Sequence, residues 1–231
     1  MSNVLAIVQA RIGSTRLPGK MMIDLHGYPI VEWVYRRICM AQKIDDVIFA
    51  IPDTHDNDVL EVFLKSLGAD VYRGSESNVV DRFYKVTMVR KPQLVVRVCA
   101  DNPLISPCIV DSLVDFFARN QCDYAYNHIP KAGGWPDGLG AEITSSSLIE
   151  KIHLESTSGA QREHLYNYIW DNQSEFSIKC VPVPKVCAYP NLKFDIDTLS
   201  DYIVLQSLPL KIDFTAEQII NCALNKNYKS I

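Results

Sequence analysis

The chain has 231 residues, of which 48% are hydrophobic and 22% charged, with a formal net charge of −4 at pH 7. This composition is typical of globular proteins and excludes collagen, low-complexity sequence and disorder. The charge excludes a global positive field that gathers nucleic acid, so any phosphate must bind at a local site. The seven cysteines lack zinc-site spacing, and no apolar run reaches the roughly 20 residues of a membrane span. We therefore expect a cytoplasmic protein with neither a nucleic-acid nor a membrane partner.

The first half of the chain alternates between strand and helix patterns. Short apolar runs predict buried strands at Val4–Val8, Val47–Ile51 and Leu94–Val98, and a shorter strand at Asp70–Tyr72. Amphipathic spacing predicts helices at Ile30–Ala41, Val59–Leu67, Val79–Met88 and Ile109–Phe117. Asp56 is expected to cap the second of them. This alternation predicts an α/β fold with a doubly wound, mostly parallel sheet.

From about residue 123 the pattern becomes α+β. Strands are expected at Asp123–Asn127, at Leu139–Ile143 near a sheet edge, at Ile178–Val181 and at Leu192–Ile196, with a Pro/Gly-rich loop at His128–Gly138. Helices are expected at Ser146–Glu155, Gln161–Trp170, Ser200–Ser207 and Thr215–Leu224. No long linker separates these segments, so residues 1–231 are expected to form one unit.

A basic loop with two glycines follows the first strand. It reads Gln9-Ala10-Arg11-Ile12-Gly13-Ser14-Thr15-Arg16-Leu17-Pro18-Gly19-Lys20. Ligands of open α/β sheets bind where loops leave the carboxyl ends of the strands. The loop matches neither the P-loop nor the GxGxxG pattern. Three cations crowd this turn with no acidic residue before Asp24, and their mutual repulsion favours a phosphate cradle over a solvated basic loop.

The loop resembles the N-terminal signature of the cytidylyltransferases that make CMP-activated sugars, such as the sialic-acid and KDO enzymes. Shorter matches follow in chain order: YRGSE from Tyr72, DRFY from Asp81, DNPL from Asp101, DGL from Asp137, and REH from Arg162. Together with Gln9 they are most similar to the spore-coat-polysaccharide branch. The resemblance implies a Rossmann-like nucleotidyltransferase domain with a nucleotide-binding half (1–122), an acceptor-binding and dimerisation region (123–190), and a metal-site segment with C-terminal helices (191–231).

The resemblance also implies which residues form the site. Arg16, Lys20, Asp101 and Asp197 are expected to be catalytic, with Asp101 and Asp197 as ligands of Mg²⁺. The expected nucleotide-binding residues are Gln9, Ala10, Arg11, Gly13, Ser14, Thr15, Arg73, Ser75, Arg82, Cys99 and Ala100. The expected acceptor-binding residues are Asp137, Glu142, Arg162 and His164. Apart from the resemblance, Trp135 is a candidate for an interface or a sugar platform.

Structural roles are open for several of these residues. Asp101 lies two residues before Pro103 and suits a turn, whereas Asp197 suits the cap of a helix after Thr198. Arg82 equally suits a surface ion pair, and His164 a buried, hydrogen-bonded position. Asp195 is expected on the opposite side of an extended segment from Asp197, but the sequence leaves open which of the two holds the metal.

The expected function is that of a Mg²⁺-dependent cytidylyltransferase, which couples CTP to a sugar and releases pyrophosphate. The expected acceptor is a nonulosonic acid or a related polysaccharide precursor, and the resemblance implies a homodimer. One alternative is an NDP-sugar pyrophosphorylase that acts on a sugar phosphate. The other is a non-catalytic nucleotide-binding protein.

Overall fold

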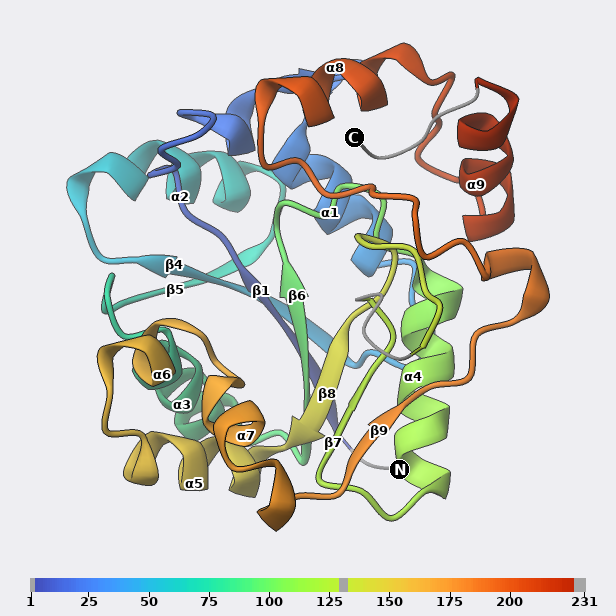
Figure 1. Ribbon diagram of the computed structural model, residues 1–231. Helices are drawn as coiled ribbons and strands as arrows, with labels where there is room; N and C mark the ends of the chain where they lie inside the picture. Colours follow the sequence, from blue (N-terminus) through green and yellow to red (C-terminus); the bar gives the residue numbers. More distant parts are fainter. Residues whose placement is uncertain (1–2, 129–132, 227–231) are drawn as a thin grey trace.

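The computed structural model describes residues 3–128 and 133–226, and within these ranges the chain builds one large mixed sheet (Figure 1). Seven strands lie in the order β5-β4-β1-β6-β8-β7-β9. Their bounds are β1 (Val4–Gln9), β4 (Asp46–Pro52), β5 (Asp70–Gly74), β6 (Leu94–Cys99), β7 (Tyr124–Tyr126), β8 (Glu142–Ser145) and β9 (Ile178–Cys180). A separate hairpin pairs β2 (Asp24–Leu25) with β3 (Tyr28–Pro29).

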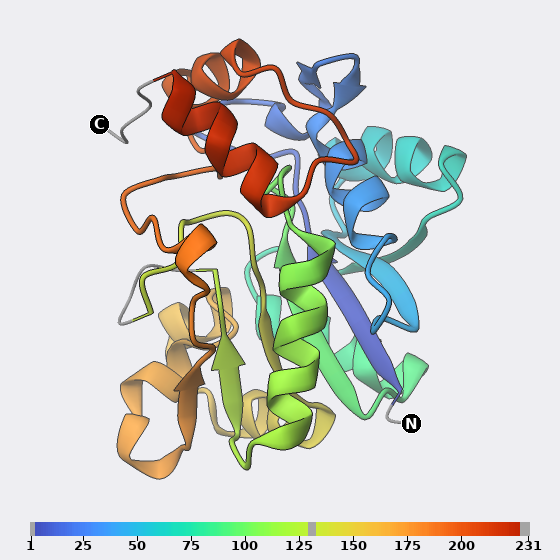
Figure 2. The same ribbon diagram turned by 90° about the vertical axis from the view of Figure 1, so that its right-hand side faces the viewer.

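Helices cover both faces of the sheet, which gives three layers (Figures 1 and 2). One face packs against α1 (Ile30–Ile38), α2 (Asp58–Ser66), α4 (Pro107–Arg119), α8 (Leu199–Ser207) and α9 (Ala216–Asn225). The other packs against α3 (Val79–Arg90), α5 (Ser146–Glu155) and α7 (Asn167–Asp171), with α6 (Gly159–Glu163) beside α3. Short 3₁₀ turns are η1 (Lys20–Met22), η2 (His55–Asn57), η3 (Gln173–Glu175) and η4 (Lys185–Cys187). The α/β fold expected from the sequence is confirmed.

The central strand β1 explains why the sequence reads as an unbroken apolar run. Leu5 and Ile7 face the helix layer that contains α3, whereas Ala6 and Val8 face the layer that contains α1. All four side chains are at most 1% exposed, because a strand covered on both faces has no solvent side. β1 pairs in parallel with β4 and β6, so the loops after β1 and β6 leave the sheet at the same end.

Two strand predictions are wrong in position or kind. The run expected at a sheet edge becomes β8, which lies between β6 and β7 and is antiparallel to both. Its placement depends on pairing partners that lie far away along the chain. Residues 192–196 are extended but form no strand, since they contribute only an isolated bridge between Lys193 and Asp137.

Two helix predictions also need correction. The helix expected at 161–170 is interrupted, because His164 adopts an extended backbone after α6 and α7 begins only at Asn167. Asp56 does not cap a helix; it lies within η2, and α2 begins at Asp58. Part of the predicted loop His128–Gly138, residues 129–132, lies outside the described residues.

Arg37 connects α1 to two distant segments. Its side chain is fully buried and donates to the carbonyl oxygens of Ile105 (2.7 Å), Ile212 (2.6 Å) and Phe214 (3.0 Å). Burial lowers the pKa of the guanidinium to about 10. The helix therefore holds the loop after β6 and the segment before α9 through one hydrogen-bonded cation.

We expect Arg37→Met to destabilise the protein by about 3 kcal/mol, because it leaves buried carbonyl oxygens without donors. The control is Arg119→Met, an exposed arginine on α4, which should cost less than about 0.5 kcal/mol. Urea denaturation of both variants measures the difference. Equal losses would contradict the role of Arg37.

Candidate functional site

A pocket of about 330 Å³ opens at the carboxyl ends of β1 and β6, which lie side by side in the middle of the sheet (Figure 1). We call it the loop pocket, because most of its wall is the basic loop after β1. The α6–α7 corner and the segment before α8 complete the wall. Its lining residues are Gln9, Ala10, Arg11, Gly13, Ser14, Thr15, Arg16, Lys20, Met21, Arg97, Cys99, Asp101, His164 and Asp197.

The basic loop is anchored at several points while its middle stays exposed. The backbone N–H of Ile12 donates to Asn57 Oδ1 at 3.0 Å, and Leu17 and Met21 are buried in the core. Gly19 has φ +67°, a left-handed conformation that places Lys20 at the start of η1. These anchors aim the Lys20 side chain into the protein and leave Arg11, Thr15 and Arg16 exposed at the surface of the loop.

The Lys20 ammonium joins three parts of the site. Its Nζ donates to Ile196 O at 2.8 Å and lies 3.2 Å from both Asp101 Oδ2 and Asp197 Oδ1. Arg16 NH2 lies 3.0 Å from the other oxygen of Asp197. The sequence argument that the loop cations go uncompensated is therefore wrong for Lys20 and Arg16, because carboxylates distant in sequence neutralise them.

Arg11 keeps its charge uncompensated, since it has no carboxylate partner in the part of the chain that the structure describes. Its neighbour is the buried guanidinium of Arg82. Burial and the charge of Arg11 lower the pKa of Arg82 to about 10. Arg82 is buried and donates to Ser75 O at 3.1 Å. The alternative that the sequence left open for Arg82, a surface ion pair, is therefore wrong. The charge of Arg11, with that of Arg82 behind it, attracts an anion to this side of the pocket.

Asp101 and Asp197 suit a small divalent cation. Both carboxylates are partly exposed (32% and 26% of the side chain) and face one common point, now held by the Lys20 ammonium. Mg²⁺ in proteins takes one or two carboxylates and completes its shell with phosphate oxygens and water. In residues 3–128 and 133–226 no group of three or more His, Cys, Asp or Glu side chains could hold a metal. This carboxylate pair therefore fits Mg²⁺ together with a phosphate ligand.

The segment before α8 shows why Asp197 is free for that role. Thr198, not Asp197, caps α8 in a capping box with Asp201. Asp195 does not lie on the opposite side from Asp197, because side chains two residues apart share a side of an extended chain and the intervening Ile196 is fully buried. Asp195 instead pairs with Lys193 at 3.0 Å. Burial and the nearby Asp137 raise the pKa of Asp195 to about 6.

Some predicted nucleotide-binding residues lie away from the loop pocket. Arg73 is engaged by Asp58 (2.5 Å), Glu61 (2.7 Å) and Asp53 (3.1 Å) on the α2 side of β5. Ser75 accepts a hydrogen bond from the Asn78 backbone at the start of α3. Ala100 is buried behind the pocket wall. Of the predicted set, only Gln9, Ala10, Arg11, Gly13, Ser14, Thr15 and Cys99 line the pocket.

The four predicted acceptor-binding residues are also separated. His164 lines the pocket from the α6–α7 corner and is exposed. The alternative that the sequence left open for His164, a buried position, is therefore wrong. Arg162 is exposed on α6, whereas Asp137 is half-buried, Glu142 is buried, and both lie outside the lining. Trp135 is not a platform. It is 1% exposed and donates from Nε1 to Val181 O at 2.7 Å within the core.

The sequence reading missed Arg97, which lines the pocket floor from β6. Its guanidinium donates to Gln9 Oε1 and to the Glu142 carboxylate. Burial alone would raise the pKa of Glu142, but the charges of Arg97 and His128 and a hydrogen bond from Tyr124 hold it well below its usual range. The available signal was a single charged residue inside the apolar run LVVRVC.

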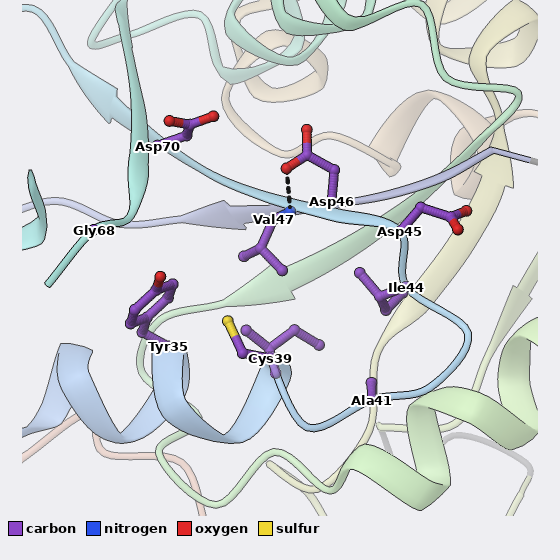
Figure 3. A pocket seen from close by; sticks show the side chains of 10 residues that line it. Tyr35, Cys39, Ala41, Ile44, Asp45, Asp46, Val47, Gly68 and Asp70 are labelled. Atoms are coloured by element: carbon purple, nitrogen blue, oxygen red, sulfur yellow. Dashed lines mark hydrogen bonds between the residues drawn. The ribbon is translucent and has the colours of Figure 1, made fainter.

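A second hollow of about 340 Å³ lies at the amino ends of β4 and β5 (Figure 3). Tyr35 and Cys39 point into it from α1, opposite the carboxylates of Asp45, Asp46 and Asp70. No lysine or arginine lines it, so its charge opposes phosphate binding. The basic loop pocket is the better site for a nucleotide.

No helix in the described ranges is both long and apolar enough to cross a membrane.

Comparison with known sequences identifies a family. The profile of the family described as Cytidylyltransferase matches residues 5–221. The uncharacterized protein MJ1063 of Methanocaldococcus jannaschii is 31% identical over 227 residues, which cover 97% of this chain and 91% of that protein. The spore coat polysaccharide biosynthesis protein SpsF of Bacillus subtilis is 30% identical over 236 residues, covering 98% and 96% of the two chains. A 3-deoxy-manno-octulosonate cytidylyltransferase of Geobacter sulfurreducens is 32% identical over 120 residues, 51% of this chain and 46% of that enzyme.

Solved structures agree with this assignment. A cytidylyltransferase from Leptospira borgpetersenii superimposes with a TM-score of 0.91 at 26% identity, covering 98% of this chain and 96% of that one. CMP:2-keto-3-deoxy-manno-octonic acid synthetase, solved with CTP, has a TM-score of 0.68 at 17% identity, covering 89% and 98%, and shares the fold.

Glu142→Gln should destabilise the protein by about 3–5 kcal/mol at pH 7, because it leaves the Arg97 charge below the pocket without its counter-ion. The folded-state pKa of Glu142 is lowered, so the stability it contributes is present above the unfolded pKa of about 4.3 and is lost as the pH falls further. The gap between wild type and variant should therefore narrow below about pH 4. Denaturation at pH 7 and pH 3.5, with the exposed Glu150→Gln as control, tests this. A gap that does not change with pH would contradict it.

Proposed function

We infer that this chain, which belongs to the cytidylyltransferase family and is a nucleotidyltransferase, couples CTP to a sugar hydroxyl and releases pyrophosphate. The observation that carries the proposal is that Lys20 Nζ lies 3.2 Å from a carboxylate oxygen of Asp101 and 3.2 Å from one of Asp197. These contacts bring phosphate-binding cations and Mg²⁺-type ligands to the end of the sheet where α/β proteins bind nucleotides.

The acceptor that fits best is a sugar acid used in polysaccharide synthesis. The names of two relatives support this class, namely the spore coat polysaccharide protein and the octulosonate enzyme. The side of the loop pocket nearest Arg11 carries an uncompensated positive charge, which favours a carboxylate-bearing acceptor. His164 faces this space from the α6–α7 corner and can hydrogen-bond a hydroxyl or carboxylate oxygen.

The proposed reaction is a direct in-line displacement. The acceptor hydroxyl oxygen forms a bond to the α-phosphorus of CTP and loses its proton to water, while the bond from that phosphorus to the bridging oxygen of pyrophosphate breaks. Arg11, Arg16 and Lys20 hold the triphosphate and offset the negative charge that develops on the leaving pyrophosphate. Mg²⁺ held by Asp101 and Asp197 would supply further neutralisation of the phosphate oxygens.

The thiol in the pocket takes no covalent part in this reaction. Burial raises the pKa of Cys99 to about 12, so almost none of it is thiolate at neutral pH, and the thiolate is the nucleophilic form. A one-step transfer needs no enzyme nucleophile. The homodimer implied by the resemblance stays a prediction.

Nucleotide selectivity tests the proposal directly. CTP with Mg²⁺ should raise the melting temperature by several degrees at about a hundredfold excess over its Kd. UTP, ATP and GTP should give smaller shifts, and omission of Mg²⁺ should reduce the CTP shift. A thermal-shift screen measures this. A preference for another nucleotide would favour an NDP-sugar pyrophosphorylase, and no response to any nucleotide would contradict the proposal.

The loop cations should be required for turnover. Lys20→Ala and Arg16→Ala should each lower the rate of pyrophosphate release from CTP by about a hundredfold or more, because each removes a positive charge that stabilises the leaving group. The assay uses a panel of 2-keto-3-deoxy sugar acids as acceptors. Lys65→Ala, an exposed change on α2 where the lysine pairs with Glu61, serves as control. Near-normal rates in both loop variants would refute this mechanism.

A further inference from the structure

We propose that Arg97 is a positioning residue that fixes the side-chain amide of Gln9, so that the amide NH₂ faces the loop pocket and donates a hydrogen bond to a substrate oxygen. This inference rests on the proposed function, because it concerns the substrate bound in the same pocket. It adds a specificity-determining donor on the pocket floor, apart from the cations of the basic loop.

The orientation of the Gln9 amide follows from the chemistry of its neighbour. Arg97 Nε and NH2 each lie 3.2 Å from Gln9 Oε1. A guanidinium has N–H donors and no acceptor, so only the oxygen of the amide can face it. The NH₂ group must therefore point away from Arg97. Gln9 lines the loop pocket, and its NH₂ has no partner among the described residues.

Backbone pairing holds the two side chains on the same face of the sheet. Arg97 lies opposite Ile7 of β1 and opposite Glu142 of β8. Gln9 comes two residues after Ile7 on the same strand, so its side chain shares that face. The sheet register thus brings the guanidinium beneath the amide and needs no flexible loop to do so.

Glu142 makes the Arg97 guanidinium a rigid support. It accepts a hydrogen bond from Arg97 NH1 on one carboxylate oxygen and from the Tyr124 hydroxyl on the other. Only 16% of the Arg97 side chain and 6% of the Glu142 side chain are exposed. Each member is held by the next, so the Gln9 donor is fixed before substrate arrives and needs no reorganisation on binding.

The ligand atom is an oxygen with a free lone pair. The floor lies on the sheet face that carries α3, α5 and α7, and His164 lines the same pocket from the α6–α7 corner. An oxygen of the nucleotide or an oxygen of the sugar acceptor can accept this hydrogen bond. A reversed amide would present its own oxygen to that atom and repel it, and Arg97 prevents this reversal.

Gln9→Glu is the decisive variant. A glutamate accepts the same hydrogen bonds from Arg97, but it has no N–H to offer the pocket and it adds one negative charge. We expect at least a tenfold loss of CTP affinity or of kcat/KM for the acceptor, with the melting temperature of the free protein close to that of wild type. Gln206→Glu, on the exposed side of α8, makes the same charge change and should leave binding and turnover unchanged.

Two measurements distinguish the source of the oxygen. Calorimetric titration with CTP and Mg²⁺ gives the Kd, and pyrophosphate release with the sugar-acid panel gives kcat/KM for the acceptor. A weaker Kd for CTP assigns the oxygen to the nucleotide. An unchanged Kd with a lower kcat/KM assigns it to the acceptor. Wild-type values in both measurements would overturn the inference.

The role of Arg97 is tested by Arg97→Lys and by the double variant. A lysine keeps a positive charge beside Glu142, but a single ammonium does not reproduce the paired Nε and NH2 contacts to Gln9. If Arg97 acts through Gln9, the double variant should lose no more activity than the more impaired single variant. Fully additive losses would overturn the positioning role, even where Gln9→Glu behaves as expected.

Failure of the proposed function looks different. In that case the wild-type protein itself neither binds CTP nor releases pyrophosphate, so the absence of activity does not depend on Gln9. A wild type that binds and turns over, together with a Gln9→Glu variant that matches it, rejects only the inference about the pocket floor.

Discussion

The site depends on one buried ammonium group. Lys20 is separated by 81 residues from Asp101 and by 177 from Asp197, yet its Nζ contacts both carboxylates and the Ile196 carbonyl. Removing such a charge from water is favourable only where counter-charges and acceptors replace the lost hydration. The basic loop, the turn after β6 and the segment before α8 must therefore come together for Lys20 to be buried. The same contacts bring the proposed Mg²⁺ ligands to the basic loop.

A second constraint lies within the sheet. β8 inserts antiparallel between β6 and β7 and brings Glu142 opposite Arg97 in the register. A buried guanidinium on a central strand needs a carboxylate at that place, and Glu142 supplies it. The ion pair lies under the pocket floor and connects the second half of the chain to the first. The two halves therefore meet in one sheet, and the pocket forms above that junction.

The sequence was most informative where short-range physics dominates. The apolar run at 4–8 reads as a buried strand because both of its faces are covered, and the loop from Gln9 to Lys20 concentrates cations and glycines that have no other evident use. Prediction from the sequence failed where the role of a residue depends on partners in other elements. Leu192–Ile196 alternates like a strand but finds no neighbouring strand. Arg73 looks like a phosphate ligand, yet it is engaged by three carboxylates that follow β4 or lie on α2.

By itself the sequence determined the α/β class, the resemblance to cytidylyltransferases and the position of the basic loop, because periodicity and local composition encode all three. Only the tertiary structure decided which carboxylates neutralise that loop and that Arg97 lies beneath Gln9. Those facts depend on strand order and register, which bring together residues tens to more than a hundred positions apart. No local pattern in the chain records such distances.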